Sequence, residues 1–233
     1  MGKEKFEIGS IKDRLESAKF YHRSGHLARA EEEYRKILQQ EPNNAEATHL
    51  MGLLALQSGK LDIAEHFINT AIELDPSKPE YFVNLGVVYY FRRNFEEAKK
   101  LFKKAIEMDN SYIEAYANLG KIFAEENELE RAREYLVKAV NMGDTDPSTL
   151  ITLAEVNFRL GLYNRAEMIC KQIFDLGIDE NQVYDILIQS LLKQNKAEEA
   201  IPFLEIMLNR DRTNEKYKEM LKEVYKQTGY SEN

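Results

Sequence analysis

The stretch NLGVVYYFRRNFEEA, from Asn84 to Ala98, places five apolar residues in a row, from Val87 to Phe91. Five consecutive apolar side chains cannot all lie on one side of an α-helix, because successive residues point in different directions around its axis. The stretch is therefore either a buried strand or a helix with two apolar faces. In the second case, one of the two faces is available for something other than packing.

A period of 34 residues favours the helix. Alanines recur at this spacing, with no insertion between them, at Ala30, Ala64, Ala98, Ala132, Ala166 and Ala200. Each period holds two blocks of apolar residues at helical spacing, and turn residues separate the blocks at Gly25, Gly59, Asn127, Gly161 and Asn195. Every period is therefore predicted to be a helical hairpin. In the third one the turn falls at Arg93-Asn94, where we expect Asn94 to adopt the left-handed backbone conformation that asparagine tolerates well.

Small residues indicate where the two helices of a hairpin meet. Gly52, Gly86 and Gly120 also share the period. Helices that pack with their axes about 8 to 10 Å apart leave room only for glycine or alanine at the closest point. We expect Gly86 and Ala98 to form that contact in the third hairpin.

The segment AYANLGKIFAEENELERAREYLVKAV, from Ala115 to Val140, resembles the tetratricopeptide repeat family through Tyr116, Leu119, Gly120, Phe123, Ala132, Leu136 and Ala139. The resemblance implies an all-α fold, a right-handed superhelical α-solenoid. It predicts a leader at 1–10, six helix-turn-helix repeats over 11–214 and a C-terminal capping helix at 215–230. The repeats would be 11–44, 45–78, 79–112, 113–146, 147–180 and 181–214.

In such a solenoid, the resemblance implies, the first helix of each repeat lines a concave groove. Counting around the helix places Leu85, Val88 and Tyr89 on the packing side. It turns Val87, Tyr90 and Phe91 toward the groove, in the stripe of Val83. The predicted peptide-binding groove comprises His49, Leu53, Leu56, Val83, Asn84, Val87, Tyr90, Phe91, Asn118, Lys121, Thr152 and Phe158. It would be apolar in repeats 2 and 3 and mixed beyond them. The alternative is that these side chains only pack against neighbouring helices.

Asn84 and Asn118 lie one repeat apart, and their amides could hold the backbone of an extended peptide. In this they are similar to the asparagine ladder of the repeats in O-linked N-acetylglucosamine transferase; the alternative is that both are merely solvent-exposed. The carboxylate clamp of chaperone-binding members is not matched, since Leu50 and Glu80 stand where Asn and Lys are needed. Chaperone C-terminal tails are therefore disfavoured as partners.

Composition restricts the classes of partner. The 233 residues carry a formal net charge of -8 and a pI of about 5.3, which argues against binding to nucleic acid or to an anionic membrane. No apolar run approaches a membrane span, and the N-terminus lacks the apolar core of a secretory signal. One cysteine excludes an intrachain disulfide, so we expect a cytoplasmic protein.

No catalytic or metal-binding pattern stands out. Cys170 shares the register of Leu136 and Phe102, which favours a core role over that of a nucleophile. His22 and His26 have a chelating spacing, but Gly25 interrupts the helix between them. We therefore predict no enzyme, no cofactor and no metal, and expect a protein-protein interaction scaffold that binds an extended or helical peptide. The alternatives are a recruiting region of a larger enzyme or of a secretion or assembly complex, and a self-associating homo-oligomer.

Overall fold

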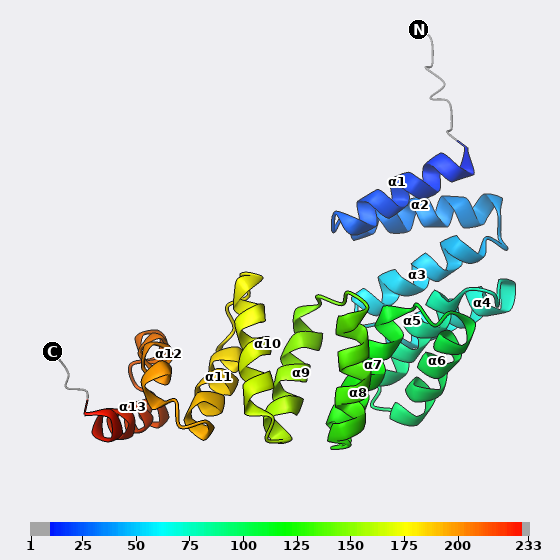
Figure 1. Ribbon diagram of the computed structural model, residues 1–233. Coiled ribbons are helices and arrows are strands. Elements are labelled where there is room, and N and C mark those ends of the chain that lie inside the picture. Colours follow the sequence, from blue (N-terminus) through cyan, green and yellow to red (C-terminus); the bar gives the residue numbers. More distant parts are fainter. Residues whose placement is uncertain (1–9, 230–233) are drawn as a thin grey trace, which may run out of the picture. The chain divides into compact units, whose positions relative to one another are not determined.

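The computed structural model describes residues 10–229, and within this range the chain forms thirteen helices and no strand (Figure 1). They are α1 Ile11–Arg23, α2 Leu27–Gln40, α3 Ala45–Gln57, α4 Leu61–Leu74, α5 Pro79–Phe91, α6 Phe95–Met108, α7 Ile113–Glu125, α8 Leu129–Asn141, α9 Pro147–Arg159, α10 Tyr163–Asp175, α11 Asn181–Lys193, α12 Ala197–Arg210 and α13 Glu215–Thr228. The predicted all-α fold is confirmed. The boundaries predicted for the six repeats, and the handedness of their superhelix, stay predictions.

The chain divides into two compact units, Met1–Ala115 and Tyr116–Asn233, and the boundary falls inside α7. In the first unit α1 packs on α2, α3 on α4 and α5 on α6. In the second unit α9 packs on α10, α11 on α12, and α12 on α13. Consecutive helices therefore pair within each unit, as expected of helical hairpins.

The stretch from Asn84 to Ala98 is helical on both sides of its turn. Val87 to Phe91 complete α5, and α6 begins at Phe95. A Cβ on Gly86 would lie 2.6 Å from Cε1 of Phe102, so the ring of α6 packs directly against this glycine of α5 and leaves no room for a side chain there. The nearest atoms belong to the Phe102 ring, and the expected contact of Gly86 with Ala98 stays a prediction. Ala98 is itself fully buried.

The expectation for the turn between α5 and α6 was wrong. Arg93 has a φ of 61°, whereas Asn94 has a φ of -88° and accepts a hydrogen bond from the backbone N–H of Glu97 at 3.4 Å. Positive φ recurs every 34 residues, at Gly25, Gly59, Arg93, Asn127, Gly161 and Asn195. Hairpin geometry therefore fixes the left-handed position, and Asn94 is used to cap α6.

Two features of the second unit, the burial of Cys170 and the packing of the last helix, concern its core. Cys170 is fully buried, and burial raises the pKa of its thiol to about 12, as expected of a core residue. Tyr217, Leu221 and Val224 of α13 are buried in the same apolar cluster. The last helix is thus packed onto the helices before it through one apolar face.

Candidate peptide-binding face

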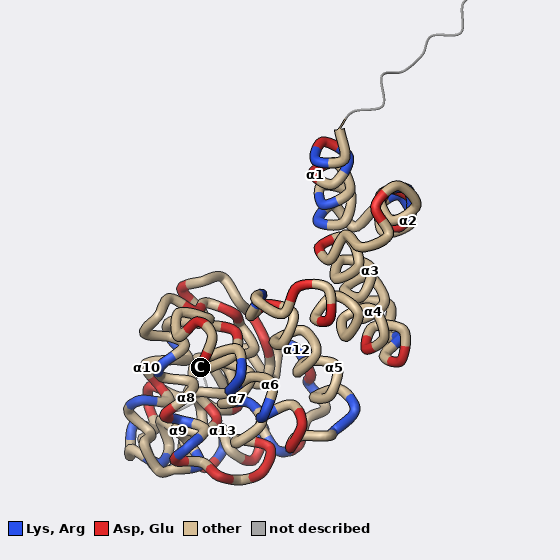
Figure 2. Tube along the Cα trace, turned by 90° about the vertical axis from the view of Figure 1, so that its right-hand side faces the viewer, with Lys and Arg blue, Asp and Glu red and all other residues tan. Residues whose placement is uncertain are grey.

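Helices α3 and α5 of the first unit carry most of the apolar residues predicted for the groove. They run side by side, since the ring of His49 in α3 contacts the ring of Tyr81 in α5, with ring centroids 4.3 Å apart. Figure 2 shows that the trace of α3 is free of Lys and Arg. We name Leu53, Leu56, Val87, Tyr90 and Phe91, all at least partly exposed to solvent, the α3/α5 face.

Phe91 is the most exposed member of this face. Its side chain is 60% accessible. The residues at the same register in the other hairpins are polar or charged, namely Arg23, Gln57, Glu125, Arg159 and Lys193. Helix packing does not use this register, and so an aromatic ring here is available to a partner.

Tyr90 has a packing role as well. Its ring lies 5.8 Å from the ring of Phe95 at the start of α6 and 5.8 Å from that of Phe91. The alternative, that these side chains only pack against neighbouring helices, therefore applies in part to Tyr90. Phe91 is the better candidate for an anchor.

Two residues expected in the groove are buried instead. Val83 is 4% exposed and His49 is 5% exposed, so the expectation that they line an open wall was wrong. Ala117 and Ile151, at the same register of the second unit, are buried too. For His49 the cause is visible, because its ring is covered by Tyr81 and Asn84 of the neighbouring first helix.

Asn84 is already engaged. Its Nδ2 lies 3.0 Å from Nε2 of His49, and the neutral imidazole accepts a hydrogen bond from this amide. Burial lowers the pKa of His49 to about 4, which keeps the ring neutral at physiological pH. One side of the Asn84 amide is thus used within the fold, which leaves its Oδ1 as the atom that could face a ligand.

The remaining predicted groove residues belong to the second unit. Lys121 is held by Asp146 at 3.2 Å and by Oγ of Ser148 at 2.6 Å. The hydroxyl of Thr152 donates to the carbonyl of Ser148 at 2.7 Å, and Phe158 packs against Tyr163 with centroids 5.6 Å apart. Asn118 is half-buried. Asn84 and Asn118 lie in different units, and their predicted ladder stays a prediction.

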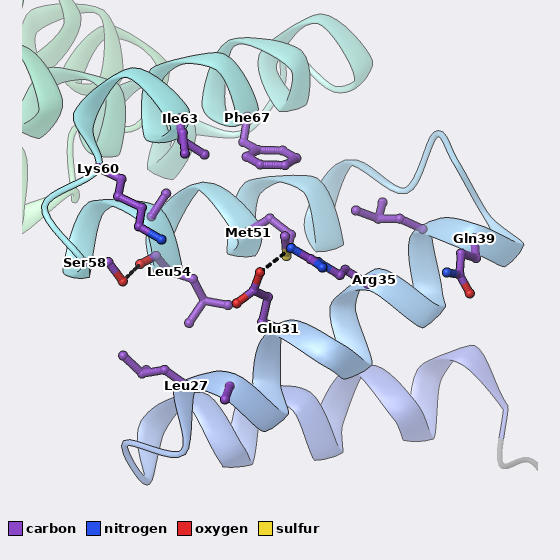
Figure 3. A pocket seen from close by; sticks show the side chains of 13 residues that line it. Leu27, Glu31, Arg35, Gln39, Met51, Leu54, Ser58, Lys60, Ile63 and Phe67 are labelled. Atoms are coloured by element: carbon purple, nitrogen blue, oxygen red, sulfur yellow. Dashed lines mark hydrogen bonds and ion pairs between the residues drawn. The ribbon is translucent and has the colours of Figure 1, made fainter.

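Sequence reasoning missed a cleft elsewhere on the first unit. It lies between α2, α3 and α4 and has a volume of about 670 Å³ (Figure 3). The sequence feature that could have predicted this cleft is a pair of small residues, Ala55 and Ser58. The next hairpin has the large residues Tyr89 and Arg92 at the same registers.

Across residues 10–229, no three His, Cys, Asp or Glu side chains gather into a potential metal site. In the same range, no helix combines the length and apolarity needed to cross a bilayer.

Comparison with known proteins identifies a family whose model matches this sequence. The model of a tetratricopeptide repeat matches residues 21–82 and 92–148, more than half of the chain. Among curated proteins, none matches the chain.

Several solved structures share the fold. A structure from the functional characterisation of Pseudomonas aeruginosa PilF has a TM-score of 0.79 and 19% identity, over 91% of this chain and 97% of that one. PilW, described as a widely conserved type IV pilus biogenesis factor, has a TM-score of 0.74 and 18% identity, over 93% and 98%. YrrB, described as a TPR protein with an unusual peptide-binding site, has a TM-score of 0.64 and 18% identity, over 78% and 93%.

Proposed function

The chain belongs to the tetratricopeptide repeat family, a family of protein-protein interaction scaffolds, and on this premise we propose that it binds a peptide segment of a partner on the α3/α5 face. The chain acts without catalysis in this proposal. The partner segment is extended or helical and presents apolar side chains. Phe91 is its anchor, with Leu53 and Val87 as the apolar surroundings.

One observation carries the proposal, namely the exposure of Phe91 at a register that is otherwise polar or charged. Aromatic residues contribute more than most others to binding at interfaces, because they bury a large area with few rotatable bonds. The neighbouring Val87 and Leu53 share one register on two adjacent helices and extend the apolar surface. A rigid helical wall also lowers the entropy cost of holding a flexible peptide.

Site-specific photocrosslinking tests this proposal in the cells that produce the protein. Phe91 is replaced by the photoreactive p-benzoylphenylalanine, and adducts are identified by mass spectrometry. Phe20 of α1, which is 61% exposed, serves as the matched control position. We expect one defined partner peptide at position 91 and no such peptide at position 20. In a purified system Phe91→Gln should then weaken binding of that peptide by about tenfold.

Equal labelling at both positions would contradict the proposal. The alternatives give different products in the same experiment. An adduct between two copies of this chain would identify the self-associating oligomer. Adducts only with subunits of one enzyme, secretion complex or assembly complex would identify a recruiting region. Such a role is also in keeping with that of PilW, a type IV pilus biogenesis factor.

We also keep a cytoplasmic location, and partners other than nucleic acid, as parts of the proposal. The acidic balance of the chain supports the second part. Fractionation of cells that produce the tagged chain, with nuclease treatment before partner capture, tests both.

A further inference from the structure

The cleft between α2, α3 and α4 has an apolar interior. Leu27 and Leu38 of α2 form one wall, Met51 and Leu54 of α3 the floor, and Ile63 and Phe67 of α4 the other wall. Figure 3 shows Ile63 and Phe67 extending from α4 toward the space that Leu27 faces from α2. We name these six residues the α2–α4 cleft. Its volume of about 670 Å³ is in the range of ligand sites in proteins.

The next hairpin junction of the same unit, between α4, α5 and α6, is bridged at the equivalent place. The hydroxyl of Tyr89 donates to Oε1 of Glu65 at 2.6 Å. The guanidinium of Arg92 pairs with both Glu65 and Asp62. Thus Tyr89 of α5, and Arg92 directly after the end of α5, both reach across to α4.

The second unit repeats the bridge with other residues. At the junction of α8, α9 and α10, Nε of Arg133 donates to Oδ1 of Asn157 at 3.0 Å. At the junction of α10, α11 and α12, Gln194 and Lys196 bind Glu167 at 3.0 Å and 2.8 Å. Asn157 shares the register of Tyr89, and Glu167 that of Glu65. A polar bridge at this place is therefore a recurring feature of the fold.

The α2–α4 cleft is where the bridging side chains are short. Ala55 stands at the register of Tyr89 and Ser58 at that of Arg92. The hydroxyl of Ser58 donates back to the carbonyl of Leu54 at 2.8 Å. Glu31, at the register of Glu65, instead pairs with Arg35 of its own helix at 2.6 Å. By comparison with the next junction, what is missing is an aromatic ring over the apolar floor and a cation that reaches Glu31 from the end of α3.

We propose that the α2–α4 cleft binds a helical segment of a partner protein that carries an aromatic residue and, three residues later, an arginine or lysine. The aromatic side chain lies against Leu54, Ile63 and Phe67, and the cation pairs with Glu31. Arg35, 66% exposed, turns out into solvent, which costs little because exposed ion pairs contribute little. The acidic net charge of the chain attracts such a basic segment.

The observations favour this occupant over an acidic one. Arg35 and Lys60 also stand at the cleft, and a carboxylate could meet them. However, the junction that is filled within the same unit uses an aromatic residue and a guanidinium against a carboxylate, and Glu31 supplies that carboxylate here. This site is separate from the α3/α5 face, and its test does not depend on the function proposed for that face.

The test uses synthetic helical peptides on the full chain. The probe is an alanine- and glutamine-based peptide of about 15 residues with one tyrosine and, three residues later, one arginine. Matched peptides replace the tyrosine with alanine or the arginine with glutamate. Fluorescence anisotropy should show a Kd of about 1 mM or tighter for the probe, and at least fivefold weaker binding for both matched peptides. Glu31→Lys should reverse the preference between arginine and glutamate.

A second variant of the protein itself supplies the aromatic ring and the cation at the end of α3 that the α2–α4 cleft lacks. Ala55→Tyr/Ser58→Arg reproduces the filled junction, so it should abolish probe binding while the helix content stays unchanged. If this variant fails to fold, Ile63→Lys replaces it, because Ile63 is 46% exposed and tolerates a polar side chain. The proposal is overturned if no peptide binds at millimolar concentration, if the glutamate peptide binds as well as the probe, or if the filled variant still binds. Self-association that competes with the probe in sedimentation would identify a second copy as the occupant and would also overturn it.

Discussion

Asn84 of α5 and His49 of α3 are joined across two neighbouring first helices by a contact of 3.0 Å between Nδ2 and Nε2. The imidazole is buried, and the ring of Tyr81 lies against it at an angle of 33°. Because the contact needs an unprotonated nitrogen, it exists only with neutral histidine. The packing of α3 against α5 is therefore linked to pH.

The first prediction follows from the pKa of His49, which burial lowers from 6.5 to about 4. Between these values the unfolded chain binds a proton that the folded chain does not. The contribution of neutral His49 to the free energy of unfolding is thus complete above pH 6.5, and it is lost as the pH falls from 6.5 to 4. It amounts to about 3 kcal/mol at most. Urea unfolding between pH 7 and pH 4 measures it.

The control for this prediction is His49→Gln, which keeps an acceptor for Asn84 but does not titrate. Acidic groups also titrate in this range, and so the informative quantity is the difference between the two proteins. As the pH falls from 7 to 4, we expect the free energy of unfolding to fall less steeply for the variant than for the unsubstituted protein. Parallel curves for both proteins would show that His49 keeps an ordinary pKa.

A second prediction concerns Glu167, whose side chain is only 9% exposed. Burial alone would raise its pKa, but hydrogen bonds from Lys171, Lys196 and Gln194 lower it to about 2. The contribution of the Glu167 carboxylate to the free energy of unfolding is therefore present above pH 4.5, and it is lost as the pH falls from 4.5 toward 2. Glu167→Gln should lower the free energy of unfolding at pH 7 by roughly 1–3 kcal/mol, since it leaves two lysines without a carboxylate.

Glu31→Gln is the matched control for Glu167, because it lies at the same register in an exposed ion pair. We expect it to change the stability at pH 7 by less than about 0.5 kcal/mol. Equal losses for the two variants would mean that the buried position of Glu167 adds nothing.

Much of the fold follows from spacing alone. Apolar periodicity and the alanine series predicted two helices per 34 residues, and thirteen helices are found in the described range. Burial was harder to predict, because a residue such as Val83 can face either the groove or the next first helix, depending on how the two helices are rotated. The α2–α4 cleft was missed for another reason. A small residue such as Ala55 indicates a cleft only when it is compared with the large residue at the same register of the neighbouring hairpin, Tyr89.

A third prediction tests the left-handed turn positions. Gly59 has a φ of 69°, and a Cβ there would have nothing within 4 Å. Gly59→Ala should therefore destabilise only through its backbone, by about 1–2 kcal/mol. Gly161→Ala, which has the same register and equally open surroundings in the second unit, should cost a similar amount. Thermal or urea unfolding checks both, and no change in either protein would contradict the prediction.

Arg93→Gly should behave differently at the same register. Relief of the left-handed backbone is worth about 1–2 kcal/mol. Two losses oppose it. The Arg93 guanidinium lies 4.8 Å from the ring centroid of Phe95, a contact worth about 0.5–1 kcal/mol, and glycine makes the unfolded chain more flexible. We expect a net change within about 0.5 kcal/mol, and a loss as large as that of Gly59→Ala would contradict this account.

The last prediction concerns the closest approach within a hairpin. Alanine is a better helix former than glycine, yet a Cβ on Gly86 would lie 2.6 Å from Cε1 and 2.9 Å from Cδ1 of Phe102. Phe102 is fully buried, so its ring cannot move away without displacing other core side chains. Gly86→Ala should therefore lower the free energy of unfolding by about 1–3 kcal/mol.

A double-mutant cycle with Phe102→Leu separates the clash from other effects of the new methyl group. Leucine is smaller and leaves space where the added Cβ would lie. The double variant should thus recover at least half of the loss caused by Gly86→Ala, with a coupling energy of about 0.5–3 kcal/mol. Additive losses would mean that the methyl group is accommodated by a shift of the helices rather than opposed by the ring. In that case Gly86 would not set the distance between α5 and α6.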